Sequence, residues 1–348
     1  MTAFRPCCLP TAVGSLPHTD PHLACDLVLR YLPEIPAWPQ LPNRTPLENM
    51  YVQFFERFPG AVIDGDKVYV DSQGQFEMGL ERLYTDYLDG ATADYDLRPR
   101  WAAGLAEMRR RWTNLPQPPQ AIKGQITGPV SAGLQITDRR RRPVLYDEVL
   151  ADALAKYLRL VASEHERVLA EACRRTIVFV DEPYLSAVGS GFIQVRRELV
   201  SELLGEVLGG LRGLKGIHCC GNTDWSLVLE TGLDVLSFDA YNYAETLALY
   251  PRELKGFLRR GGILAWGVVP SDQRALDGED ANSLVAKLLG WVELLAGKGL
   301  EREEILATSL ITPSCGLGTL APAAAARALA LTAEVAGTVR SEFLDGVC

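Results

Sequence analysis

Residues 177–180 read Ile-Val-Phe-Val and residues 263–266 read Ile-Leu-Ala-Trp, two runs without a polar interruption. Such runs are typical of strands that are buried on both faces of a parallel sheet. Similar short apolar segments recur along the chain and alternate with amphipathic helical stretches. The segments are residues 11–15, 34–40, 120–126, 176–181, 214–219, 233–239, 262–268 and 306–312. Strands alternating with helices in this number predict an α/β fold, a (β/α)8 TIM barrel.

The alternation is interrupted once, after the second segment, between about residues 42 and 119. This stretch predicts helices over residues 47–58, 77–88 and 101–112, with one alternating segment at residues 68–71. No Ser/Gly linker or composition shift marks a boundary there. We therefore expect residues 1–348 to form a single catalytic barrel domain with an α-rich insertion after strand 2.

Composition excludes several classes of protein. The 348 residues are 47% hydrophobic and 23% charged, which is ordinary globular usage. The net charge of −9 argues against a nonspecific nucleic-acid or anionic-membrane binder. No apolar run approaches the roughly 20 residues that cross a bilayer, and the first ten residues lack the apolar core of a signal peptide. A cytoplasmic protein is expected.

The segment His218-Cys219-Cys220 ends the fifth expected strand. Residues i and i+2 of a strand point to the same side, so His218 and Cys220 can converge while Cys219 faces away. Cys315 follows the eighth strand, and Asp239 ends the sixth. Imidazole and thiolate are ligands that Zn²⁺ favours, and the active sites of barrels lie at the carboxyl ends of the strands. The pattern is consistent with a zinc site of His218, Cys220 and Cys315, with Asp239 supplying an oxygen ligand or a second-shell hydrogen bond. Spacing alone equally allows cysteines that are only buried small hydrophobic residues.

Five motifs in chain order carry a resemblance to known methyltransferases. Residues 218–222, His-Cys-Cys-Gly-Asn, resemble the His-x-Cys-Gly-Asn of corrinoid:coenzyme M methyltransferases of the uroporphyrinogen-decarboxylase-like superfamily. Residues 313–317, Pro-Ser-Cys-Gly-Leu, resemble the zinc motif of cobalamin-independent methionine synthase. Residues 13–19, 124–129 and 180–183 look like further parts of the catalytic half of that synthase.

The resemblance implies an enzyme, a methyltransferase that makes methionine by transferring a methyl group to the zinc-bound thiolate of homocysteine. In that case His218, Cys220 and Cys315 serve catalysis by holding Zn²⁺. Asp181 holds the substrate ammonium group, and Gly14 and Ser15 receive its carboxylate. Glu182 is a further substrate-site residue, which orients either the loop or the metal shell.

The sequence departs from the full-length synthase in two ways that concern the methyl donor. It has no room for the second, folate-binding barrel, and the segment 267–272 lacks the histidine that is thought to protonate the departing folate. The chain therefore looks like a short "core" methionine synthase that uses methylcobalamin, another methyl-corrinoid or a corrinoid protein as donor.

Two alternatives remain at this point. The acceptor could be coenzyme M or another small thiol, although a sulfonate acceptor calls for a cation where Asp181 stands. The protein could also be a non-catalytic barrel that binds a corrinoid or a thiol. A corrinoid carrier of the usual kind has an Asp-x-His-x-x-Gly motif, which this sequence lacks.

Overall fold

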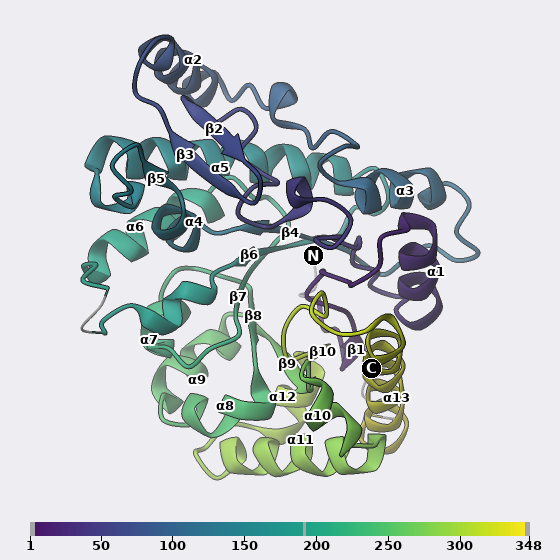
Figure 1. Cartoon of the computed structure of the whole chain (residues 1–348). Coiled ribbons are helices and arrows are strands. Elements are labelled where there is room, and N and C mark those ends of the chain that lie inside the picture. Colours follow the sequence, from purple (N-terminus) through teal and green to yellow (C-terminus); the bar gives the residue numbers. More distant parts are fainter. Residues whose placement is uncertain (1–3, 191–192, 345–348) are drawn as a thin grey trace.

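The computed structural model describes residues 4–190 and 193–344 (Figure 1). Its central feature is a curled sheet of seven strands in the order β1-β10-β9-β8-β7-β6-β4, with all neighbours parallel. The strands are β1 (Leu9–Pro10), β4 (Ile122–Thr127), β6 (Thr176–Asp181), β7 (Leu214–Cys219), β8 (Val235–Phe238), β9 (Ile263–Val269) and β10 (Ser309–Pro313). The α/β class with a parallel sheet is as the sequence predicts.

The second expected strand, residues 34–40, does not form a regular strand. It makes two isolated parallel bridges, one between Ala37 and Lys123 of β4 and one between Gln40 and Ser15 beyond β1. The reason is local, because Pro36 and Pro39 have no N–H to donate to a ladder. The hydrogen bonds thus show seven strands and a bridging segment between β1 and β4, where the prediction has eight strands.

Two predicted strand boundaries also need correction. Ladder pairing of the first strand lies at Leu9–Pro10, before the predicted residues 11–15, because Leu9 and Pro10 pair with Leu310 and Ile311. The last strand begins at Ser309 and not at residue 306, since Arg302–Ala307 forms helix α12.

Helices cover the outer face of the sheet (Figure 1). The longest two are 22 residues each, and Asp147 caps one of them by accepting hydrogen bonds from the N–H groups of Val149 and Leu150. The helices are α1 (Pro21–Tyr31), α2 (Phe76–Asp89), α3 (Ala103–Trp112), α4 (Pro129–Gln135), α5 (Glu148–Leu169), α6 (Arg197–Leu208), α7 (Trp225–Leu229), α8 (Ala240–Leu247), α9 (Pro251–Arg259), α10 (Gln273–Asp277), α11 (Ala281–Ala296), α12 and α13 (Pro322–Phe343). Within the described residues, no helix has the length and apolar character to span a membrane.

Residues 42–119 contain α2 and α3, close to two of the predicted helices, and a hairpin of β2 (Ala61–Asp64) and β3 (Lys67–Val70). The strand β5 (Thr137–Asp138) extends this hairpin. The helix predicted over residues 47–58 is wrong, since only a short 3-10 helix at Pro46–Glu48 and turns are present. Side chains compete with the helix here, because the Asn49 side chain accepts a hydrogen bond from the Tyr51 N–H, 2.9 Å away.

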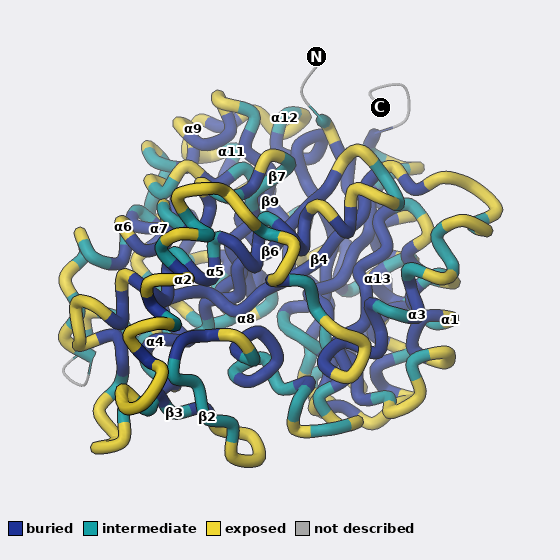
Figure 2. The backbone as a smooth tube through the Cα atoms, turned by 90° about the horizontal axis from the view of Figure 1, so that it is seen from above, coloured by how far each residue is buried: buried dark blue, intermediate teal, exposed yellow. Residues whose placement is uncertain are grey.

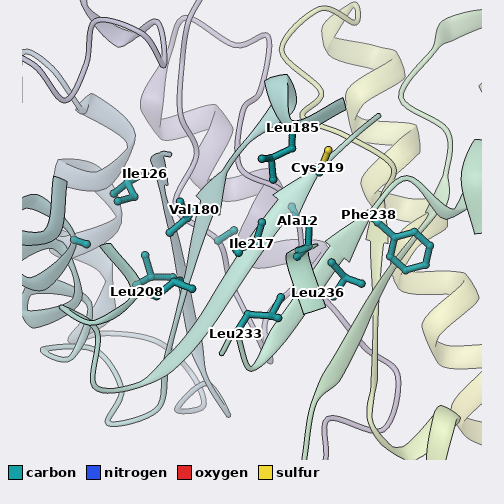
Figure 3. Packing of buried hydrophobic residues seen from close by; sticks show 14 of the residues in the cluster. Ala12, Ile126, Val180, Leu185, Leu208, Ile217, Cys219, Leu233, Leu236 and Phe238 are labelled. Carbon is teal, nitrogen blue, oxygen red and sulfur yellow. The ribbon is translucent and has the colours of Figure 1, made fainter. Parts of the chain in front are cut away.

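The strands of the parallel sheet are mostly buried, as the dark blue of the tube shows (Figure 2). Their side chains alternate between the two faces of the sheet. Outward residues such as Val180, Ile217 and Leu236 join the large cluster that packs under the helices (Figure 3). Inward residues form a second, smaller cluster: Leu9, Ile35, Ala121, Ile177, Phe179, Val235, Ile263, Ala265 and Leu310. On the same inward face, the side chains nearer the carboxyl ends of the strands are polar. These polar residues form the candidate site.

Candidate functional site

Three candidate ligands lie together at the carboxyl ends of two strands. His218 is in β7, Cys220 follows that strand, and Cys315 follows β10. Their ligand atoms all lie within 4.8 Å of one another. Cys219 points the other way and is buried among the outward residues, as Figure 3 shows. The two-residue period of the strand therefore selects Cys220 over its neighbour.

The His218 ring is oriented by a neighbour that the sequence reasoning missed. His218 pairs with Ser237 across β7 and β8, and His218 Nδ1 lies 2.9 Å from Ser237 Oγ. His218 Nε2 is buried and has no hydrogen-bond partner. A ring whose Nδ1–H donates to a hydroxyl presents the Nε2 lone pair to a ligand, as metal-binding histidines do. Ser237 could have been found two residues before Asp239, on the same face of the strand.

We expect Ser237→Ala to weaken metal binding by about 10- to 100-fold, because the imidazole loses the partner that fixes its tautomer. Chelator competition measures this affinity. A matched control is Ser309→Ala, since Ser309 is also a buried strand serine but bonds to Ile305 and Trp266. Equal metal affinity in the two variants would contradict an orienting role for Ser237.

The thiols of Cys220 and Cys315 shift each other's pKa in opposite directions. The Cys315 thiol lowers the pKa of Cys220 to about 4 through a hydrogen bond, although burial opposes this shift. The same hydrogen bond raises the pKa of Cys315 well above its usual value. Two adjacent thiolates repel each other, and a divalent cation between them removes that repulsion. With one free imidazole nitrogen and two sulfur atoms, the residues present fit zinc.

Asp239 lies outside this three-residue group, as far as the described residues show. Asp239 directly follows β8, and its carboxylate caps the N-terminus of α8. Its Oδ1 accepts from the Asn242 N–H at 3.0 Å and its Oδ2 from the Asn242 side chain at 2.7 Å. Its role as an oxygen ligand or second-shell partner stays a prediction.

Asp181 stands beside the ligands. It ends β6, pairs with His218 across the sheet and is buried. Its Oδ1 has no hydrogen-bond partner. Burial raises the pKa of Asp181 to about 6, and Lys123 and His218 act against that rise. A buried carboxylate oxygen without a partner, in the interior that His218 faces, is suited to bind a cationic group.

Glu182, which follows β6, is bound to the beginning of α4. Its two carboxylate oxygens accept hydrogen bonds from the N–H groups of Val130 and Ser131 and from the Ser131 hydroxyl, at 2.6 to 2.8 Å. It therefore holds the N-terminus of α4. Burial raises the pKa of Glu182 to about 7. The predicted role of Glu182, in orienting the Gly14–Ser15 loop or the metal shell, stays a prediction.

The Gly14–Ser15 loop lies against the Cys315 loop. The Leu317 N–H donates to the Ser15 carbonyl at 2.9 Å, and a Cβ on Gly316 would lie 2.1 Å from Ser15 Oγ. Gly14 has φ of +145°, and a Cβ there would lie 2.5 Å from the Gln125 side chain. Only glycine fits this position, so the loop can approach β4 closely.

Tyr51 is another residue that the sequence reasoning missed. Its ring packs edge-on against Tyr184 with centroids 6.3 Å apart. Burial raises the pKa of Tyr51, with smaller contributions from Tyr184, Glu182 and Cys220. The hydroxyl thus lies on the Cys220 side of the molecule. No sequence signal marks it, since its segment was predicted to be a helix.

No family model matches the chain, and no curated protein sequence matches it. Solved structures do match. A B12-independent methionine synthase from Shewanella sp. W3-18-1, in complex with selenomethionine, aligns with a TM-score of 0.62 and 16% identity over 97% of this chain and 99% of its own. A methyltransferase from Methanosarcina mazei aligns with a TM-score of 0.56 and 16% identity over 96% of this chain and 94% of its own. At such identities the likeness concerns the fold, and this chain has the fold of these methyltransferase structures, the B12-independent methionine synthase among them.

Proposed function

We propose that the chain is a zinc-dependent methyltransferase that makes methionine by methylating the thiol of homocysteine, with a methyl-corrinoid as donor. The observation that carries the proposal is the group of His218, Cys220 and Cys315, with a buried and unpartnered Nε2. The fold supports it, since the Shewanella structure of the same fold holds selenomethionine, an amino acid with a methylated chalcogen.

Different residues bind the two ends of the substrate, which are its thiol and its amino-acid group. When bound, zinc would supply the Lewis acidity that keeps a thiol ligand deprotonated at neutral pH. His218, Cys220 and Cys315 would hold the ion, and Ser237 orients the imidazole. Asp181 receives the substrate ammonium, and the Gly14–Ser15 loop receives the carboxylate. A zwitterion needs both an anion and donors at such positions.

The corrinoid donor rests on the lack of the histidine that is thought to protonate a departing folate. No histidine follows His218 in the sequence. Asp272, which ends the segment 267–272, is exposed and caps α10. Tetrahydrofolate is a poor leaving group without a proton, whereas a cobalt(I) corrinoid leaves with the electron pair of the carbon–cobalt bond and needs none. Chain length does not help this choice, because the B12-independent Shewanella chain is covered over 99% of its length.

Assays with zinc-loaded protein, homocysteine and one donor at a time test the proposal. We expect methionine from methylcobalamin and none from methyltetrahydrofolate. Methionine from methyltetrahydrofolate alone would keep the acceptor and overturn the donor. The absence of methionine with either donor, from protein that holds its zinc, would contradict the acceptor as well.

A further inference from the structure

A buried lysine lies in the interior of the sheet, close to the candidate site. Lys123 in β4 is 0% exposed. Its ammonium group donates to the Val13 carbonyl and, at 3.0 Å, to Gln125 Oε1. Its Nζ also lies 4.4 Å from the centroid of the Phe179 ring. Lysine is almost never fully buried without a partner, because removing its charge from water is costly.

The lysine side chain connects segments between which the described residues form no ladder. Residues 34–40 link β1 and β4 through isolated bridges and single backbone hydrogen bonds, such as Gln40 N–H to the Gly14 carbonyl. The Lys123 side chain crosses this region to Val13, and the Gln125 side chain donates to the Trp38 carbonyl at 3.4 Å. Gly14 rests directly on Gln125. The Lys123–Gln125 pair therefore supports the Gly14–Ser15 loop from beneath, beside the backbone hydrogen bonds that join Gln40 to Gly14 and Leu16.

Lys123 and Asp181 form a pair of opposite charges without direct contact. No carboxylate in the described part of the chain forms an ion pair with Lys123, although Asp181 is its main charged neighbour. Burial lowers the pKa of Lys123 to about 7, and Asp181 opposes this shift. Lys123 lies beneath the loop assigned to the substrate carboxylate, and Asp181 lies at the place assigned to the substrate ammonium. A bound zwitterion would therefore bring an opposite charge to each of these two buried groups.

We propose that Lys123 is a positioning residue that selects thiols with an α-amino-acid group over plain thiols, by fixing the Gly14–Ser15 loop and placing a buried cation beneath it. This inference rests on the proposed function, because it concerns the amino-acid end of the same substrate.

Lys123→Met tests the inference in zinc-loaded protein, with calorimetric titration of homocysteine and of 3-mercapto-1-propanol, a neutral thiol. A displaced loop loses hydrogen bonds to the charged substrate carboxylate, and the loss of one such bond costs about tenfold or more in affinity, so we expect the Kd of homocysteine to rise by about 10- to 100-fold. The Kd of the neutral thiol and the zinc content stay as in the wild type. Lys123→Gln keeps an N–H donor without the charge, and it decides the matter if Lys123→Met does not fold.

Ile177→Val is the matched control. Ile177 pairs with Lys123 across β4 and β6 and belongs to the inward apolar cluster. This variant should lower the melting temperature and leave both Kd values unchanged. Unchanged homocysteine binding in the lysine variants, or an equal loss for both thiols, would overturn the positioning role. A wild type that does not prefer homocysteine would instead refute the proposed function.

Discussion

Replacing Cys220 by serine is expected to abolish zinc binding while the protein stays folded. A serine hydroxyl is not deprotonated at neutral pH, so the site loses one of its two anionic sulfur ligands. The loss should exceed the roughly 10- to 100-fold that removal of an orienting partner costs. The fold should survive, because the buried clusters under the helices and inside the sheet do not depend on the ligands.

Elemental analysis of purified protein measures the effect, and circular dichroism checks the fold. The chain offers a close control in Cys219→Ser, one residue away. Cys219 is buried on the opposite face of the strand, and its thiol donates to the Gly221 carbonyl at 3.4 Å. Cys219→Ser should keep its zinc. If the two variants exchanged these outcomes, the assignment of ligands along β7 would be wrong.

Asp181→Asn should reduce the affinity for homocysteine by about 10- to 150-fold without changing zinc content. The substitution keeps the size of the side chain and removes the negative charge that faces the ammonium group. Hydrogen bonds to charged groups contribute roughly 1.5–3 kcal/mol, and each 1.4 kcal/mol is about tenfold in affinity. Calorimetric titration of zinc-loaded protein gives the affinity directly.

Asp224→Asn is a suitable control for the Asp181 variant, because Asp224 is an exposed carboxylate that pairs with Arg197 and caps α7. It should bind homocysteine as the wild type does. If Asp181→Asn also binds normally, the amino-acid site lies elsewhere, and an acceptor without an ammonium group, such as coenzyme M, becomes the better candidate.

Strong local signals made most of the fold predictable. The strands at residues 176–181 and 214–219 have the predicted bounds. The first contains the continuous apolar run of residues 177–180, which favours a buried strand. Residues 34–40 are also largely apolar, but their two prolines lack the N–H groups that a ladder of hydrogen bonds needs. Residues 47–58 place apolar side chains near helical spacing, but the capping side chain of Asn49 and tertiary burial lead to turns.

The site residues were predictable where the two-residue period of a strand or a short sequence motif marks them. The alternation of a strand is enough to bring His218 and Cys220 together. Ser237 is a single polar residue in β8, and Lys123 shares β4 with Gln125 and Thr127. The importance of Lys123 and Ser237 lies in contacts with residues far away in the sequence. The capping task of Glu182 likewise depends on the position of α4, which a linear motif does not express.

At the bridging segment between β1 and β4, the continuous pairing of the curled sheet is interrupted. Every other junction between neighbouring strands is a ladder, whereas this junction is formed by isolated bridges and single backbone hydrogen bonds, among them Lys123 N–H to the Pro36 carbonyl and Gln40 N–H to the Gly14 carbonyl. Pro36 and Pro39 donate none, so we expect this junction to open before the longer ladders do. The Gly14–Ser15 loop borders that place, so the least rigid line of the scaffold coincides with the part of the site that must adapt to its ligand.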